Sequence, residues 1–284
     1  MKRREFVASS AGLAVAGSAI PAAATSLPTG TSPLRQAVTR WPFSSMPLDA
    51  FCGLLREIGF GAVDLVDQKD WATVQRHGLA VSTANSSQRR DFISRGLNDR
   101  TNHALILGEL EGVIPAAKRA GIPNVIAMFG NRGARSDADG IAACAEGLAK
   151  IAPVAERHGV TVILEMLNSR VDHADFHGDR VGFGVAVVEA VASPNVKLLY
   201  DIYHMQIMDG DIIRTIGRQA KWFAHYHTAG NPGRNELSSG QELQYAAIAR
   251  AIAATGFTGW IAHEFTPRGD TAAALREAFT VCSV

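Results

Sequence analysis

The sequence has few cysteines, no long apolar run after its N-terminus, and no excess of positive charge. Its three cysteines, Cys52, Cys144 and Cys282, are scattered and do not make a disulfide framework. No apolar run beyond the N-terminus is long enough to be a stable membrane span. Basic and acidic side chains number 28 and 27, so nothing in the charge balance suits a phosphate backbone. We therefore expect a soluble chain with neither a nucleic-acid nor a membrane partner.

The first 24 residues resemble an export signal. Lys2, Arg3 and Arg4 form a basic start, a mildly apolar stretch follows, and Ala22–Ala24 has the form of a cleavage site. An arginine pair two residues before Phe6 is typical of the twin-arginine route, and an ordinary secretory peptide is the alternative. Removal of residues 1–24 would lower the basic count from 28 to 25 and the acidic count from 27 to 26, a net charge of −1. We expect a periplasmic protein, with a linker over 25–33.

The remaining residues, 34–284, alternate short apolar runs with longer helical patterns. Several of the runs are almost continuously apolar, as expected for parallel strands buried on both faces. The predicted strands cover residues 34–39, 61–67, 79–84, 124–130, 160–166, 196–202, 222–228 and 259–265. The predicted helices cover residues 47–58, 69–77, 102–120, 136–158, 182–192, 210–219, 244–255 and 271–281.

Eight strands that alternate with eight helices over roughly 250 residues predict a (β/α)8 TIM barrel. The alternative is a doubly wound open sheet, which normally carries a glycine-rich phosphate loop after an early strand. The sequence lacks the pattern G-x-G-x-x-G. Nothing inside 34–284 marks a domain boundary, so we predict a single α/β barrel domain.

The last four predicted strands each end in a side chain that can bind a metal ion or move a proton. These side chains are Glu165, Asp201, His227 and Glu264, at intervals of 36, 26 and 37 residues, each about one β/α repeat. The active site of a TIM barrel forms at the C-terminal ends of its strands. The four side chains are therefore predicted to converge on one half of the barrel mouth.

Three carboxylates and a neutral imidazole would carry a net charge of −3 and would lose hydration in an apolar barrel. Singly, an acid at a strand end is more often a helix cap or an ion-pair partner, and a histidine there is more often a core residue. Four of them on consecutive strands favour a divalent cation. The oxygen-rich donor set suits Mn²⁺, Mg²⁺ or Co²⁺, and Zn²⁺ stays open.

The other histidines are expected to have structural roles or to lie at the surface. His225 shares a strand face with His227 and should lie one layer deeper, with a hydrogen-bonded structural role. His263 should point away from the mouth, toward the helices. His173 and His177, in the loop VDHADFHG, are expected at the surface.

Four segments resemble motifs of the hydroxypyruvate isomerases: LEMLNSRVDH, LLYDIYHMQIMDGD, NPGRNE and GWIAHEFTPRG. That family belongs to the xylose isomerase-like barrels, together with the ketose 3-epimerases and the endonuclease IV-type enzymes. The resemblance covers most of 34–270. It implies one divalent metal ion held by Glu165, Asp201, the residue at 227 and Glu264, with the two glutamates as the acid/base pair. It also implies that His204 and Arg234 contact the substrate.

Three features depart from the pattern that the resemblance implies. His227 stands where hydroxypyruvate isomerases carry glutamine, and histidine there is the pattern of the ketose 3-epimerases. The segment SSGQELQY is one residue longer than the usual GTGEINY. Export is also unusual, since hydroxypyruvate metabolism is cytoplasmic.

The predicted function is isomerisation of a small α-hydroxy carbonyl compound, of the hydroxypyruvate and tartronate semialdehyde type. A metal ion acidifies the C–H bond, one glutamate removes the proton, and the other returns it to the neighbouring carbon. Return to the opposite face would instead make a ketose 3-epimerase, and the residues do not choose between the two. Arg234 could clamp a substrate carboxylate or hold a loop.

Two other functions compete with this prediction. A phosphodiesterase acting on abasic DNA would need histidines after the second and third strands, where the chain has VDQKDW and TANSSQ. A non-catalytic exported sugar-binding barrel would have no need of two acid/base carboxylates. We therefore expect a sugar or sugar acid as the partner, and we leave open whether the chain forms a homo-oligomer.

Overall fold

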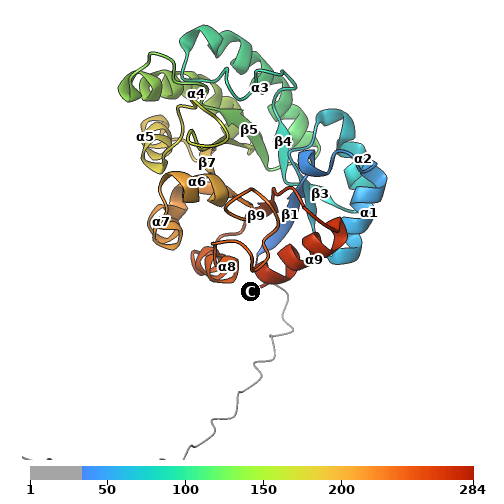
Figure 1. The fold of residues 1–284 in the computed structure, drawn as a ribbon. Helices are drawn as coiled ribbons and strands as arrows, with labels where there is room; N and C mark the ends of the chain where they lie inside the picture. Colours follow the sequence, from blue (N-terminus) through green and yellow to red (C-terminus); the bar gives the residue numbers. More distant parts are fainter. Residues whose placement is uncertain (1–33) are drawn as a thin grey trace, which may run out of the picture. The chain divides into compact units, whose positions relative to one another are not determined.

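The structure is a computed structural model that describes residues 34–284 (Figure 1). The predicted export signal over 1–24 and the linker over 25–33 lie outside these residues. Within the described part of the chain, none of the helices has the length and apolar character needed to span a membrane.

Parallel strands form a barrel wall, and helices surround it on the outside (Figure 1). The strands are β1 (Arg35–Thr39), β2 (Ala62–Asp64), β3 (Ala80–Val81), β4 (Thr83–Asn85), β5 (Asn124–Met128), β6 (Thr161–Glu165), β7 (Val196–Asp201), β8 (Phe223–Thr228) and β9 (Trp260–His263). Their order in the sheet is β3-β2-β1-β9-β8-β7-β6-β5-β4, and every neighbouring pair is parallel. The predicted TIM barrel is confirmed.

The barrel closes at the third predicted strand, which is divided at Ser82 into β3 and β4. The first part pairs with β2 and the second with β5. An isolated bridge between Val66 and Ala84 links the stretch after β2 to β4, and the amide of Ser82 donates to the carbonyl of Val63 at 3.0 Å. The two ends of the sheet order therefore belong to one stretch of chain, which brings the first strands beside the last ones.

Each predicted helix is present, with both ends within two residues of the prediction. The helices are α1 (Leu48–Ile58), α2 (Trp71–Arg76), α3 (His103–Arg119), α4 (Asp137–His158), α5 (Val181–Val191), α7 (Ile212–Gln219), α8 (Tyr245–Ala254) and α9 (Thr271–Cys282). Single turns of 3₁₀-helix occur at η1 (Trp41–Phe43), η2 (Gln68–Asp70), η3 (Arg100–Asn102) and η4 (Ala220–Trp222). Gly59 and Gly159 end α1 and α4 with φ of 114° and 61°, a conformation that glycine adopts without a steric penalty.

One further helix, α6 (Ile202–Met208), was not predicted and follows β7 directly. The sequence IYHMQIM is mostly apolar, and a short apolar run does not distinguish a helix from the continuation of a strand. Asp201 begins the helix, since its carboxylate accepts a hydrogen bond from the amide of His204 at 3.0 Å. His204 thus lies on the first turn of a helix that starts in the barrel mouth.

Candidate active site

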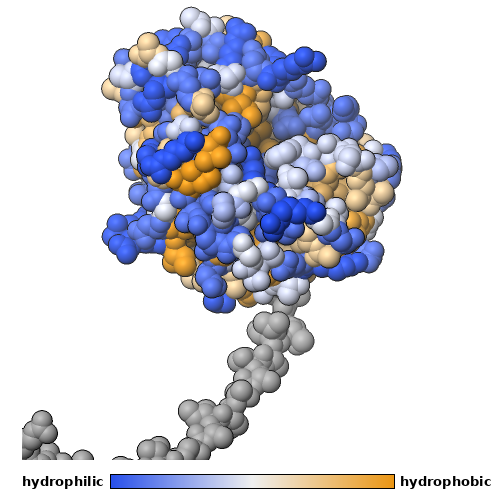
Figure 2. Space-filling model, viewed as in Figure 1, coloured by the Kyte–Doolittle hydropathy of each residue, from blue (hydrophilic) through white to orange (hydrophobic). Residues whose placement is uncertain are grey.

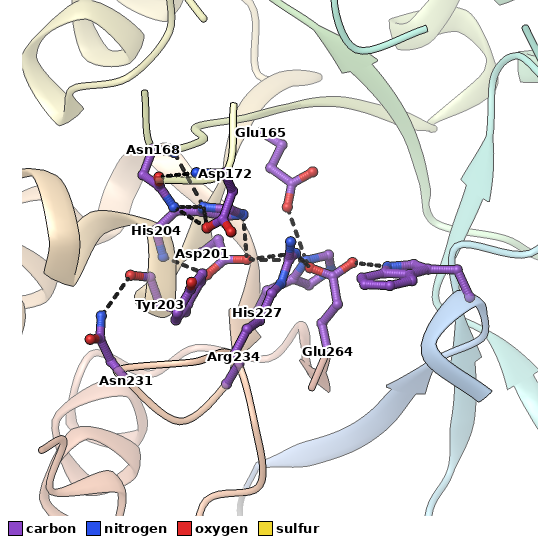
Figure 3. A network of polar contacts seen from close by, with 12 residues as sticks. Glu165, Asn168, Asp172, Asp201, Tyr203, His204, His227, Asn231, Arg234 and Glu264 are labelled. Carbon is purple, nitrogen blue, oxygen red and sulfur yellow. Dashed lines mark hydrogen bonds and ion pairs between the residues drawn. The ribbon is translucent and has the colours of Figure 1, made fainter. Parts of the chain in front are cut away.

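The four side chains predicted to converge do meet in the structure, at the C-terminal ends of β6 to β9 (Figure 3). Glu165 and Asp201 are the last residues of β6 and β7, His227 lies near the end of β8, and Glu264 follows β9. Each offers one ligand atom, and these atoms lie within 4.8 Å of one another. All four side chains are buried, with at most 4% of the residue surface exposed.

The imidazole of His227 lies at the centre of this cluster. Its Nδ1 is 3.1 Å from Glu165 Oε1 and 3.1 Å from Glu264 Oε2. Its Nε2 lies 2.9 Å from Asp64 Oδ2, on the opposite side of the ring. In the sheet, β9 lies on one side of β8, and β7 followed by β6 lies on the other. Glu264 and Glu165 therefore approach His227 from opposite sides, and one ring atom faces both.

Asp64, the last residue of β2, is a site residue that the sequence reasoning missed. It is fully buried, and its Oδ1 lies 3.1 Å from His225 Nε2 and accepts a hydrogen bond from Ser82. Burial acts to raise the pKa of Asp64, but His225 and His227 outweigh it and hold the pKa far below its usual value. A carboxylate at this place accepts the Nε2–H of His227, which leaves Nδ1 as the atom available to a metal ion.

Burial and charge shift the pKa values of the clustered groups in opposite directions. Burial raises the pKa of the Glu165 carboxyl, and the Glu264 carboxylate raises it further. Burial raises the pKa of Asp201 to about 7 against the opposing field of Arg234. Burial acts to raise the pKa of Glu264 too, but His227 and Arg234 hold it below its usual range. Without a bound cation, the acids depend on His227 and Arg234 for their countercharge.

A divalent metal ion fits these residues by their chemistry. Buried carboxylates that repel one another, with an imidazole nitrogen among them, are the donors that Mn²⁺, Mg²⁺, Co²⁺ and Zn²⁺ accept. A second group of potential ligands, Asp64, His225 and His227, also lies within 4.8 Å. Its atoms are already paired with one another at 2.9 and 3.1 Å, so we interpret it as support for His227.

Arg234 lies on the loop after β8 and faces the acids. Its guanidinium is 2.5 Å from Glu264 Oε2 and 3.9 Å from Asp201 Oδ2. It also stacks over the rings of Trp41 and Tyr203, at 5.2 and 5.5 Å. Its Nε is buried and has no hydrogen-bond partner, so it can still donate to a ligand.

Trp41, on η1 directly after β1, is a second residue that the sequence reasoning missed. Its indole Nε1 donates to Glu264 Oε1 at 2.6 Å. Glu264 is therefore held by Trp41 through one oxygen and by His227 and Arg234 through the other. A tryptophan immediately after the first strand was the available signal, because the ends of all the strands of a TIM barrel reach the same mouth.

His204, predicted to contact the substrate, lies behind Asp201. It is fully buried, and its Nδ1 is 2.6 Å from Nδ2, the side-chain amide nitrogen, of Asn168. Its Nε2 has no hydrogen-bond partner and is 3.7 Å from Asp201 Oδ2. The side chain is outside the lining of the cavity beside the acids, so a direct contact with substrate stays a prediction.

The structure corrects the expectation that His173 and His177 lie at the surface. His173 is half-buried and lines the cavity beside the acids. His177 is fully buried, with Nδ1 3.1 Å from Asn98 Nδ2 and its ring 4.6 Å from that of Phe183. The loop folds back over the barrel and carries both rings inward, which its polar sequence did not indicate.

The structural role predicted for His263 agrees with its surroundings. The hydrogen-bonded role predicted for His225 does not, because neither of its ring nitrogens has a hydrogen-bond partner among the described residues and its Nε2 only lies 3.1 Å from Asp64 Oδ1, within ion-pair distance. The ring of His225 lies 5.2 Å from that of His227, and both are fully buried. His263 bonds through one nitrogen to Thr228 at 2.7 Å and through the other to Gln36 at 3.0 Å.

Comparison with known proteins places the chain in a family. The family model described as xylose isomerase-like TIM barrel matches residues 52–282. A 2-oxo-tetronate isomerase of Cupriavidus necator is 33% identical over 214 residues, which cover 72% of each chain. The hydroxypyruvate isomerase of Escherichia coli is 26% identical over 208 residues, which cover 73% of each chain.

A solved structure has the same fold as the chain. The AP endonuclease, family 2, from Brucella melitensis superposes with a TM-score of 0.74 and 24% identity, over 85% of this chain and 97% of that one. Because the family model spans most of the described residues, the chain belongs to the xylose isomerase-like TIM barrel family.

Proposed function

We propose that the chain is a divalent-metal-dependent isomerase of a small α-hydroxy carbonyl compound, of the hydroxypyruvate and tartronate semialdehyde type. The observation that carries this proposal is the pair of buried carboxylates, Glu165 and Glu264, each 3.1 Å from the same nitrogen of His227. The related isomerases support an isomerase, and their names point to small sugar acids.

The two glutamates would carry the proton transfer. One carboxylate removes the proton from the carbon that bears the hydroxyl, which gives an enediolate, and the other carboxyl returns a proton to the neighbouring carbon. A bound divalent ion, held by Glu165, Asp201, His227 and Glu264, would supply charge stabilisation for the enediolate. Burial of all four side chains keeps bulk water from quenching the intermediate.

Arg234 and Trp41 would position the reacting groups. The guanidinium of Arg234 lies next to Glu264, where it can hold a substrate carboxylate through paired hydrogen bonds. The indole of Trp41 fixes the Glu264 carboxylate in place from the other side. Positioning of this kind keeps the base within reach of the proton that it removes.

A ketose 3-epimerase is the second candidate, and His227 is the observation that favours it. The same two carboxylates would then return the proton to the opposite face of the same carbon. Export by the twin-arginine route and a periplasmic location remain part of the proposal.

Exchange with solvent deuterium separates these functions. The Mn²⁺-loaded protein is incubated in D₂O with hydroxypyruvate and with a panel of ketoses, and C–H exchange is followed by NMR. We expect exchange that is lost in Glu165→Gln and in Glu264→Gln but kept in Glu189→Gln, an exposed glutamate on α5. Isomerised and epimerised products identify the two candidates, and binding of these compounds without exchange would contradict both.

A further inference from the structure

A cavity of about 340 Å³ opens beside the acids at the barrel mouth. Cavities of roughly 300–1,000 Å³ usually enclose ligands of drug size. A three-carbon acid at the two glutamates would therefore leave most of this space unfilled.

Much of the rest of the cavity lining is apolar, and we call this part the apolar wall. It consists of Leu65, Phe92, Ile93, Ile126, Met128 and Leu167. Ile126 and Met128 share one face of β5, and Met128 is in register with Glu165 on the adjacent strand. Figure 2 shows hydrophobic surface gathered at the hollow in the middle of this face of the molecule. One strand step thus separates the acid/base site from a hydrocarbon surface.

The apolar wall offers little to the hydroxyl groups of a sugar. The lining also includes Asn85, whose Nδ2 already donates to Leu65 O at 3.2 Å and to Asp67 Oδ1 at 2.8 Å, so its Oδ1 is the atom left to accept from a ligand. His173 is the other polar residue of the lining outside the acid and arginine group. Hydroxyls placed against the wall would lose water without gaining equivalent partners.

We infer that the substrate is an α-hydroxy carbonyl compound whose far end is an apolar group about the size of a phenyl ring, bound against the apolar wall. The inference rests on the proposed function, since the carbonyl end has to reach Glu165 and Glu264. The apolar end would fill the space that a small acid leaves. Each methylene that such a wall binds changes kcat/KM by about 10–200-fold.

Three ketones with the same reacting end test this inference. All three present a hydroxymethyl group next to a carbonyl. Beyond the carbonyl, hydroxyacetone has only a methyl group, benzyl-substituted hydroxyacetone has an apolar extension, and erythrulose has a hydroxylated extension. In D₂O the hydroxymethyl C–H bond breaks and a deuteron replaces the proton, so no oxidant or reductant is consumed. With the Mn²⁺-loaded full chain, the rate constant of exchange divided by KM is measured for each compound. We expect its value for the benzyl compound to exceed the values for hydroxyacetone and erythrulose at least tenfold.

Variants of the wall connect this preference to its cause. Phe92→Ala should lower the ratio of the two exchange rate constants divided by KM, benzyl compound to hydroxyacetone, at least tenfold. Ile213 is exposed on α7, so Ile213→Ala should leave this ratio unchanged. If Phe92→Ala does not fold, Met128→Gln tests the same surface at nearly constant volume.

A benzyl-to-hydroxyacetone ratio below ten, with hydroxypyruvate still converted, overturns the inference and leaves the isomerase intact. A preference for erythrulose over the benzyl compound would also overturn the inference and leave the isomerase intact. Absence of exchange with hydroxypyruvate and with all three ketones overturns the proposed function, and the inference with it.

Discussion

The two halves of the barrel mouth carry different chemistry. From β6 to β9, the strands end in Glu165, Asp201, His227 and Glu264, all buried and close enough to share one cation. From β2 to β5, the cavity is lined by aliphatic side chains such as Leu65, Ile126 and Met128. We call these the charged half and the apolar half. In the proposed function, the charged half would move protons and the apolar half would select the substrate that reaches them.

The halves also differ in their contribution to stability. Aliphatic side chains in the second half gain free energy from burial, by about 25 cal/mol for each Å² removed from water. Acids in the first half lose hydration and repel one another, which the raised pKa values of Glu165 and Asp201 record. The charged half is stable only because cations face it, whether Arg234, His227 or a bound metal ion.

A matched pair of amide substitutions gives the largest expected difference. Glu165 and Met128 lie in register on adjacent strands, so Glu165→Gln and Met128→Gln place the same group on either side of the boundary. Glu165→Gln should slow deuterium exchange into hydroxypyruvate by about 10²–10⁴-fold, because it removes an acid/base group. Met128→Gln should have a much smaller effect in the same NMR measurement. Equal losses would show that the two halves are not divided by function.

Truncation of a buried side chain in the apolar half should destabilise the fold. Ile126 is 1% exposed and packs inside β5, so Ile126→Ala should lower the free energy of unfolding by about 2–5 kcal/mol. Urea denaturation of the metal-free protein measures this change. A loss below about 1 kcal/mol would mean that the apolar wall is loosely packed and is not a fixed surface.

The charged half could be predicted from the sequence, because its signal is local. Acids and a histidine at the ends of apolar runs, spaced by one β/α repeat, identify the C-terminal ends of consecutive strands. The barrel itself could be predicted for the same reason, from periodicity and from glycines such as Gly59 that end helices.

The apolar half depends on contacts between distant segments, which periodicity does not report. The sequence did not indicate that Asp64 ends a strand, because the predicted strand ran to residue 67. In the structure β2 ends at Asp64, and Leu65 takes a φ of 49°. Phe92 and His173 lie on loops whose path over the mouth is set by packing. Trp41 lies on a 3₁₀ turn, and its role emerges only when Glu264, at the other end of the chain, comes beside it.

Replacement of Asp201 by asparagine should stabilise the metal-free protein. The pKa of Asp201 is about 7 in the folded chain against 3.8 for the ordinary group, so folding favours the protonated form. As the pH rises from about 4 to 7, the Asp201 carboxyl releases its proton in the unfolded chain before it does so in the folded chain. The free energy of unfolding therefore falls by about 2–4 kcal/mol over this range. The substituted side chain would still cap α6, since asparagine caps helices as well as aspartate does.

Thermal or urea unfolding as a function of pH tests this prediction for Asp201→Asn. Without metal, the variant should be more stable than the parent near pH 8 and indistinguishable from it near pH 4. Addition of Mn²⁺ should reverse the order, because only the parent keeps the full set of ligands. A variant that is less stable than the parent near pH 8 without metal would contradict the account of the charged half.

Asp64 joins the two halves, and its replacement should have the smallest effect of the series. It lies on β2, among the strands of the apolar half, yet its carboxylate accepts from His227 and turns Nδ1 toward the other acids. Asp64→Asn should weaken Mn²⁺ binding by about 10–100-fold, measured by competition with a chelator. Ser82→Ala, which removes one hydrogen bond to Asp64 but keeps its charge, should have a smaller effect. Nitrogen chemical shifts of the His227 ring report which nitrogen carries the hydrogen. Unchanged metal affinity and an unchanged tautomer in Asp64→Asn would show that the charged half holds its metal ligands without help from the apolar half.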